Sequence, residues 1–89
     1  MSNSLYLGQI VITQNAKEVL TGCDLNAALL RHQLGDWGDV YEDTAEANRE
    51  AANTDGDILS VYTSANDVRF FIKTEQCIQT TTVYLPWED

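Results

Sequence analysis

The amino-acid sequence predicts a single α+β domain over residues 1–89, in which an antiparallel sheet of three to four strands packs against two to three helices. Helix-type sequence with capping residues fills much of 15–53, whereas alternating or threonine-rich β-type sequence fills 58–85. A further β-branched run precedes the helices at 6–13. Because the helices and most of the strands are segregated along the chain, the α+β class follows.

Two short elements open the chain. Tyr6–Thr13 is predicted to be the first strand, because its β-branched residues favour extended structure. Asn15 is expected to cap a helix from Ala16 to Leu20, with Glu18 three residues after the cap. The Thr-Gly pair that follows ends this helix.

The longest helix is predicted from Leu25 to Leu34, with Asp24 as its N-cap. Its buried face is expected at positions i, i+3, i+4 and i+7, which are Leu25, Ala28, Leu29 and His32. Gly35 follows the last periodic residue, where a left-handed helix C-cap is expected.

A compact turn and an acidic helix come next. Gly35, Trp37 and Gly38 are expected to form the turn, with Trp37 folded back onto the core. Asp43 or Thr44 is predicted to cap the helix that follows. This helix carries acids at four-residue intervals, at Glu42, Glu46 and Glu50. A turn at 53–56 ends it.

The last part of the chain is predicted to be a three-stranded meander over 58–63, 68–75 and 80–85, with a hairpin connection at 64–67. The first strand is expected to join this sheet. In the middle strand, four side chains should point toward the helices: those of Val68, Phe70, Ile72 and Thr74. Arg69, Lys73 and Glu75 should then lie on the opposite face.

The charge distribution is uneven. Fourteen acids against five bases give a net charge of −9. Residues 36–57 contain eight acids and one base, so this segment carries −7. Such a chain repels a phosphate backbone, so direct nucleic-acid binding is not expected. The sequence also has no apolar run long enough for a membrane helix and no secretory leader, which favours a cytoplasmic protein.

The two cysteines, Cys23 and Cys77, belong to no paired metal-ligand spacing. We expect two small, partly buried thiols in a reducing compartment. A disulfide between them stays open, because sequence does not give their separation.

Two segments carry a resemblance to a known group. The first is Arg31–Val40, which reads Arg-His-x-x-Gly-Asp-Trp-Gly-Asp-Val, and the second is Thr81–Pro86, which reads Thr-Thr-Val-x-Leu-Pro. With the acidic helix between them, the chain from Leu7 to Pro86 resembles short bacterial proteins of plasmids, integron cassettes and other mobile elements. The loop Gln76–Gln79 departs from the more polar sequence of that group. The resemblance implies a mobile-element setting and brings no activity, cofactor or catalytic residue.

His32 is the centre of the sharpest catalytic hypothesis, an acid–base or hydrolytic site with Asp36, Asp39 and Glu75. Histidine titrates near neutral pH, and a carboxylate can fix its tautomer. In the alternative interpretation, which we favour, His32 is structural and binds a backbone carbonyl or Asp36 at the helix end. No nucleophile, phosphate loop or second histidine accompanies it.

Carboxylates also suggest a metal site, since Asp36, Asp39, Glu42 and Asp43 offer hard oxygen ligands. Their spacing fails the EF-hand pattern. We therefore expect a solvated cluster, with no metal and no cofactor.

The acidic helix is the preferred functional surface. Glu42, Asp43, Glu46 and Glu50 are predicted to bind a basic protein, as an acidic stripe can steer such a partner into contact. Self-association through an edge strand is a further expectation, with aromatic residues at the interface: Phe70, Phe71, Tyr84 and Trp87. The leading hypothesis is thus a small accessory protein acting by protein–protein contact. The alternative is a hydrolase-like or ligand-binding protein that uses His32.

Overall fold

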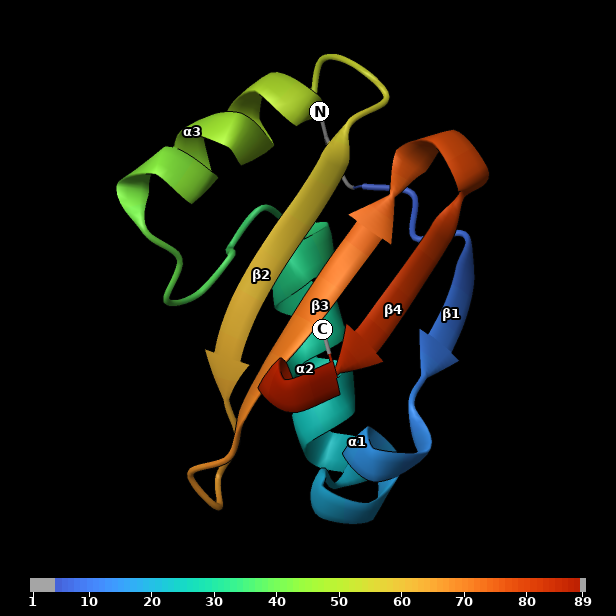
Figure 1. Ribbon diagram of the computed structural model, residues 1–89, viewed down its shortest axis with the longest axis vertical. Helices are drawn as coiled ribbons and strands as arrows, with labels where there is room; N and C mark the ends of the chain where they lie inside the picture. The colour runs from blue at the N-terminus through green and yellow to red at the C-terminus, as the bar shows by residue number, and fades with distance from the viewer. Residues whose placement is uncertain (1–4, 89) are drawn as a thin grey trace.

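The computed structural model describes residues 5–88 and confirms an α+β fold. Its regular elements, in chain order, are β1 (Gln9–Ile12), α1 (Gln14–Val19), α2 (Gly22–Gln33), α3 (Glu42–Ala51), β2 (Asp57–Thr63), β3 (Arg69–Glu75) and β4 (Thr80–Tyr84). Two 3₁₀ turns follow the last strands, η1 (Gln76–Ile78) and η2 (Pro86–Glu88). Figure 1 shows α2 behind the sheet, α3 beside β2, and η2 on the face of the sheet toward the viewer.

The strands form one mixed sheet in the order β1-β4-β3-β2. The meander is antiparallel, as predicted, with Ser60 opposite Ile72 and Ile72 opposite Val83. The expectation of a fully antiparallel sheet is wrong at one edge, because β1 pairs with β4 in parallel, with Ile12 opposite Val83. A parallel neighbour needs a long crossover instead of a hairpin. The chain between β1 and β4 supplies it through the helices and the first two strands of the meander.

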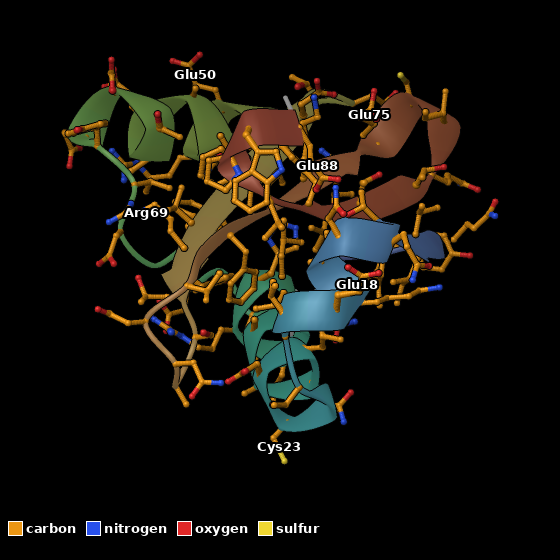
Figure 2. The ribbon with its side chains drawn as sticks, turned by 60° about the horizontal axis from the view of Figure 1, so that its bottom comes forward. Glu18, Cys23, Glu50, Arg69, Glu75 and Glu88 are labelled. Atoms are coloured by element: carbon orange, nitrogen blue, oxygen red, sulfur yellow. The ribbon has the colours of Figure 1, made fainter. Side chains whose placement is uncertain are left out.

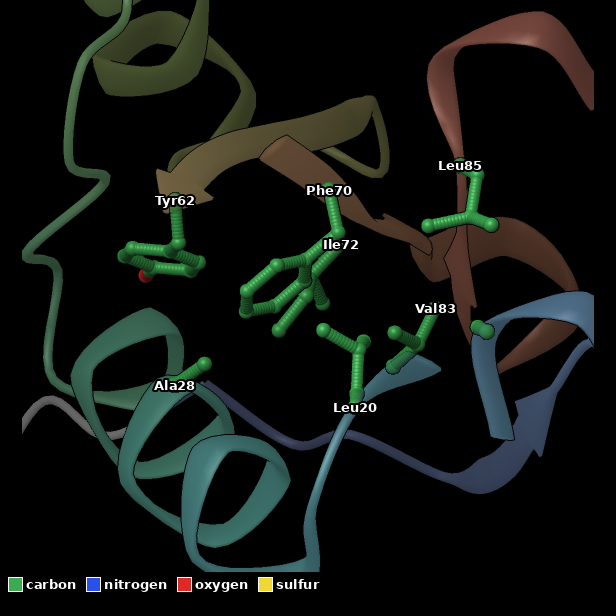
Figure 3. Close-up of a cluster of buried hydrophobic side chains, with 8 residues drawn as sticks. Leu20, Ala28, Tyr62, Phe70, Ile72, Val83 and Leu85 are labelled. Carbon is green, nitrogen blue, oxygen red and sulfur yellow. The ribbon is translucent and has the colours of Figure 1, made fainter. Parts of the chain in front are cut away.

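The core lies between α2 and the sheet (Figure 3), and eight buried residues form it: Ala16, Leu20, Ala28, Tyr62, Phe70, Ile72, Val83 and Leu85. Leu25 and Leu29 pack against this cluster, so the predicted face of α2 does point inward. The predicted alternation in β3 is confirmed, since Phe70 and Ile72 are almost completely buried. Burial of one such side chain contributes about 1.5–3 kcal/mol.

The first two helices begin earlier than predicted. The N-cap of α1 is Thr13 and not Asn15, and the Thr13 hydroxyl accepts a hydrogen bond from the Ala16 N–H at 3.1 Å. In α2 the N-cap is Thr21, and Asp24 lies three residues further on. The Thr21 hydroxyl accepts from the Asp24 N–H at 3.1 Å, and the Asp24 carboxylate accepts from the Thr21 N–H at 3.2 Å. Asp24 thus completes a capping box in which both N-terminal donors are satisfied.

The cap predicted for α3 is also wrong. Tyr41 is its N-cap and makes no side-chain capping bond. Asp43 accepts instead from the N–H of the next residue, Thr44, at 2.8 Å. The predicted turn after α3 is confirmed at 53–56, and the hairpin at 64–67 is confirmed with Asp67 at φ 67°.

Candidate functional site

His32 lies at the centre of a buried chain of hydrogen bonds between α2 and the sheet. Its Nδ1 is 2.6 Å from the Ser60 hydroxyl, and its Nε2 is 2.8 Å from the Thr74 hydroxyl. The Thr74 hydroxyl is 2.7 Å from that of Thr81, which donates to the Leu7 carbonyl oxygen at 2.6 Å. His32, Ser60, Thr74 and Thr81 are each at most 1% exposed.

The donor and the acceptor in each of these hydrogen bonds follow from the Leu7 carbonyl oxygen at the end of the series. A carbonyl oxygen cannot donate, so the Thr81 hydroxyl must donate its proton to the Leu7 carbonyl oxygen. Thr74 must then donate to Thr81, which leaves its oxygen to accept from His32 Nε2–H. Nδ1 is consequently unprotonated and accepts from Ser60. His32 is therefore the neutral Nε2–H tautomer, in agreement with burial, which lowers the pKa of His32 to about 4.

The four residues of the catalytic hypothesis are not brought together. Asp36 binds Arg31 at 2.8 and 3.1 Å, so the predicted Asp36–His32 contact is wrong. The Arg31 guanidinium holds the pKa of Asp36 below its ordinary value. Glu75 alternates with the inward-facing Thr74 and lies on the other face of the sheet. The backbone N–H of Asp39 is bonded to Val61, on the edge of β2. At this helix end Asp36 pairs with Arg31, five residues before it, and not with His32, because α2 buries the His32 side chain in the core.

The end of α2 is built largely as predicted. Gly35 has φ +89°, its N–H donates to the His32 carbonyl, and the Asp36 N–H donates to the Arg31 carbonyl at 2.8 Å. This pattern of two bonds is a Schellman motif. The Asp36 carbonyl accepts from the Tyr62 hydroxyl, and Arg31 lies 4.8 Å over the Tyr62 ring. The turn is thereby tied to β2.

Trp37 does not join the core cluster, contrary to the prediction. It is half-buried and lines a cavity of about 190 Å³, together with His32, Tyr6, Gln33 and Gln76. The cavity wall, within the described residues, contains no Asp or Glu. The cavity therefore lacks the converging carboxylates that an acid–base site with His32 would need.

The outward edge of β2 is closed by two contacts. The Asn48 amide donates to the Leu59 carbonyl at 2.8 Å and its oxygen accepts from the Leu59 N–H at 3.0 Å. Next along the strand, Val61 exchanges hydrogen bonds with the Trp37 carbonyl and the Asp39 N–H. The Asn48 amide thus makes the two hydrogen bonds that the backbone of a neighbouring strand would make, and so fixes α3 to the sheet. Sequence reasoning missed it, although Asn48 is a polar residue on the alanine-rich inner side of this helix.

The predicted acidic surface is exposed. Glu42, Asp43, Glu46 and Glu50 are all accessible to solvent. Glu46 and Glu50 are two residues before and after the buried Asn48, about 160° from it around the helix. Figure 2 shows Glu50 pointing away from the molecule. One acid is paired, since Arg49 contacts Glu42 at 2.9 Å across an exposed surface.

A groove of about 430 Å³ lies on the face of the sheet that points away from α2, which we call the outer face. Its floor consists of Leu59, Val61 and Phe71, and its rim includes Arg69 from β3 and Tyr41 from the loop before α3. Figure 2 shows Arg69 close to that loop. Such a groove could hold an apolar side chain from another molecule.

The described part of the chain contains no group of three or more His, Cys, Asp or Glu side chains able to hold a metal ion. Asp36 and Glu42, two of the acids of the metal hypothesis, pair instead with Arg31 and Arg49. Cys23 and Cys77 are free and exposed, so the expectation of partly buried thiols is wrong. Figure 2 shows Cys23 at the N-terminal end of α2.

Among residues 5–88 we find no helix with the length and apolar character needed to cross a membrane. Comparisons of the chain with protein-family models, with curated proteins and with solved structures find no significant match.

Proposed function

We propose that this protein is a small binding protein that acts by protein–protein contact, and that the acidic side of α3 receives a basic partner. The observation that carries the proposal is the position of Glu46 and Glu50. Both are exposed on the side of α3 opposite Asn48, within a segment that holds most of the net charge of −9.

The attachment of α3 supports this role. Asn48 holds the helix to Leu59 with two hydrogen bonds, and Ala51 is buried on the same side. The acids are therefore presented on a fixed scaffold, which lowers the ordering cost of association. Clustered charge of one sign also accelerates the encounter with a basic protein.

The sequence resemblance adds a setting to the proposal. In a mobile genetic element, a cytoplasmic acidic protein could occupy the DNA site of a nucleic-acid-binding protein and so act as an accessory factor. The acids of α3 would then replace phosphates as partners of Lys and Arg on that protein.

A second candidate function is small-ligand binding in the cavity beside His32. The cavity volume of about 190 Å³ and the half-buried Trp37 favour it. The engaged ring nitrogens of His32 count against a catalytic role, because each already has a hydroxyl partner within 2.8 Å.

The proposal is tested by affinity capture from a cell lysate with two matched variants. Glu46→Lys/Glu50→Gln alters the acidic side of α3, whereas Glu18→Lys/Asp67→Asn alters exposed acids elsewhere. Each raises the net charge by three, and Asn tolerates the positive φ at residue 67. The first variant should lose a partner that the wild type and the second variant retain. Equal capture by both variants refutes the proposal.

A further inference from the structure

The outer face carries a protruding aromatic side chain and a groove next to each other. Trp87, in η2, is 69% exposed. The groove begins at Phe71, whose ring meets that of Tyr84 edge-on with 5.4 Å between centroids. Tyr84 precedes Trp87 by three residues, and η2 packs on β3 (Figure 1). Trp87 and the groove therefore flank the Phe71–Tyr84 pair.

The groove suits an indole ring. Leu59, Val61 and Phe71 offer apolar and aromatic contact. Arg69 lies on the rim and, within residues 5–88, makes no ion pair, so its guanidinium can stack on an indole face. The Asp39 carboxylate, also on the rim, can accept a hydrogen bond from the indole N–H.

A two-fold dimer requires that both complementary features lie on one surface of the chain. Trp87 and the groove meet this condition. We propose that two copies of this protein associate face to face through their outer faces, with Trp87 of each copy in the groove of the other. Tryptophan is among the residues that most often dominate binding energy in such central positions.

The outer face carries bases that moderate the repulsion between two copies of this acidic chain. Arg69 and Lys73, two of the five bases, lie on it and offset part of the charge of the acids there, which are Asp39, Asp57, Glu75 and Glu88. The acids Glu46 and Glu50 point outward from α3. The dimer thus keeps Glu46 and Glu50 of both chains out of the interface and leaves the proposed partner surface free. The β2 edge offers no equivalent route, because Asn48 and residues 37–39 already occupy it.

Sedimentation equilibrium from about 5 to 500 µM tests the dimer. The wild type should shift from the mass of one chain to that of two, and added salt should strengthen the association by screening the net charge. Trp87→Ala should weaken it more than about 100-fold, because each dimer loses two central contacts. Tyr6→Ala is the matched control, since Tyr6 is also 69% exposed, and it should leave the dissociation constant unchanged. A wild-type chain that stays monomeric throughout overturns the proposal.

A mixing experiment tests the predicted contact itself. Thr44→Phe should fill the groove and weaken self-association as Trp87→Ala does, while a native circular-dichroism spectrum confirms folding. In the mixture, Trp87 of the Thr44→Phe chain can enter the open groove of the Trp87→Ala chain. The mixed pair should therefore associate at least about 10-fold more tightly than either variant alone. Equal affinities rule out Trp87 in the groove. Arg69→Ala, a milder groove variant, should weaken the wild-type dimer about 10-fold by loss of the cation–π contact.

Discussion

Acid should destabilise the fold through His32, and the size of the effect can be worked out from its environment. Burial lowers the pKa of His32 to about 4 in the folded chain, against the ordinary value of 6.5 in the unfolded chain. The folded state thus binds fewer protons, so this stability is fully present above pH 6.5 and is lost as the pH falls toward 4. The full loss is about 3 kcal/mol, of which about 2 kcal/mol is lost between pH 8 and pH 5.

His32→Gln isolates this contribution, because glutamine does not titrate. Urea unfolding of both proteins at pH 8 and pH 5 gives four free energies of unfolding. We expect the wild type to lose about 2 kcal/mol more than the variant between the two pH values. Carboxyls with lowered pKa values, such as Asp36 and Glu88, titrate equally in both proteins and cancel in the difference.

The tautomer provides an independent check on the same hydrogen-bond chain. Nitrogen chemical shifts of the His32 ring at pH 7 should show a protonated Nε2 and an unprotonated Nδ1. Equal pH dependence of the wild type and His32→Gln would refute the buried neutral histidine. A protonated Nδ1 would refute the derived direction of the hydrogen bonds.

Two stability measurements test how the edge of β2 is closed. Gly38→Ala should cost more than about 2 kcal/mol, because Gly38 has φ +72° and a Cβ there would lie 2.1 Å from a backbone oxygen of β2. Gly22→Ala, where the added Cβ meets nothing within 4 Å, should be neutral or stabilising by up to about 1 kcal/mol; equal losses for the two variants would contradict the close approach. Asn48→Ala should cost about 2 kcal/mol, because both Leu59 backbone groups lose their partner. Asn53→Ala, an exposed site, should cost less than about 0.5 kcal/mol, and a similar value for Asn48→Ala would show that the amide does not hold the helix.

Local sequence patterns were sufficient for most of the fold. The helical period of Leu25, Ala28 and Leu29 and the two-residue period of Phe70 and Ile72 both reflect one buried face, and that face is the core. The N-caps of α1 and α2 were mispredicted because several capping residues are crowded near each helix start, as at Thr21 and Asp24, and local sequence does not select among them. The N-cap of α3 was missed because it is Tyr41, which makes no side-chain capping bond. The parallel pairing of β1 was missed because it depends on a long-range crossover.

The hydrogen-bond partners of His32 were harder to predict from the sequence. Its partners Ser60 and Thr74 lie 28 and 42 residues away. One indication was present, since both occupy inward positions of alternating strands among apolar neighbours. A polar residue at such a position requires a buried partner, and the histidine on the inner face of α2 is that partner. The groove on the outer face could not be foreseen, because it depends on the path of the loop at 39–41.

The most direct test of the proposed function is a three-arm capture experiment at pH 8. Glu46→Lys/Glu50→Gln, the charge-matched Glu18→Lys/Asp67→Asn and the folded His32→Gln variant are compared with the wild type in one lysate. If the acidic side of α3 is the contact surface, the first variant alone loses the captured partner. Retention of the partner by the first variant would contradict the proposal, and loss by His32→Gln in addition would place the partner contact near the cavity beside His32.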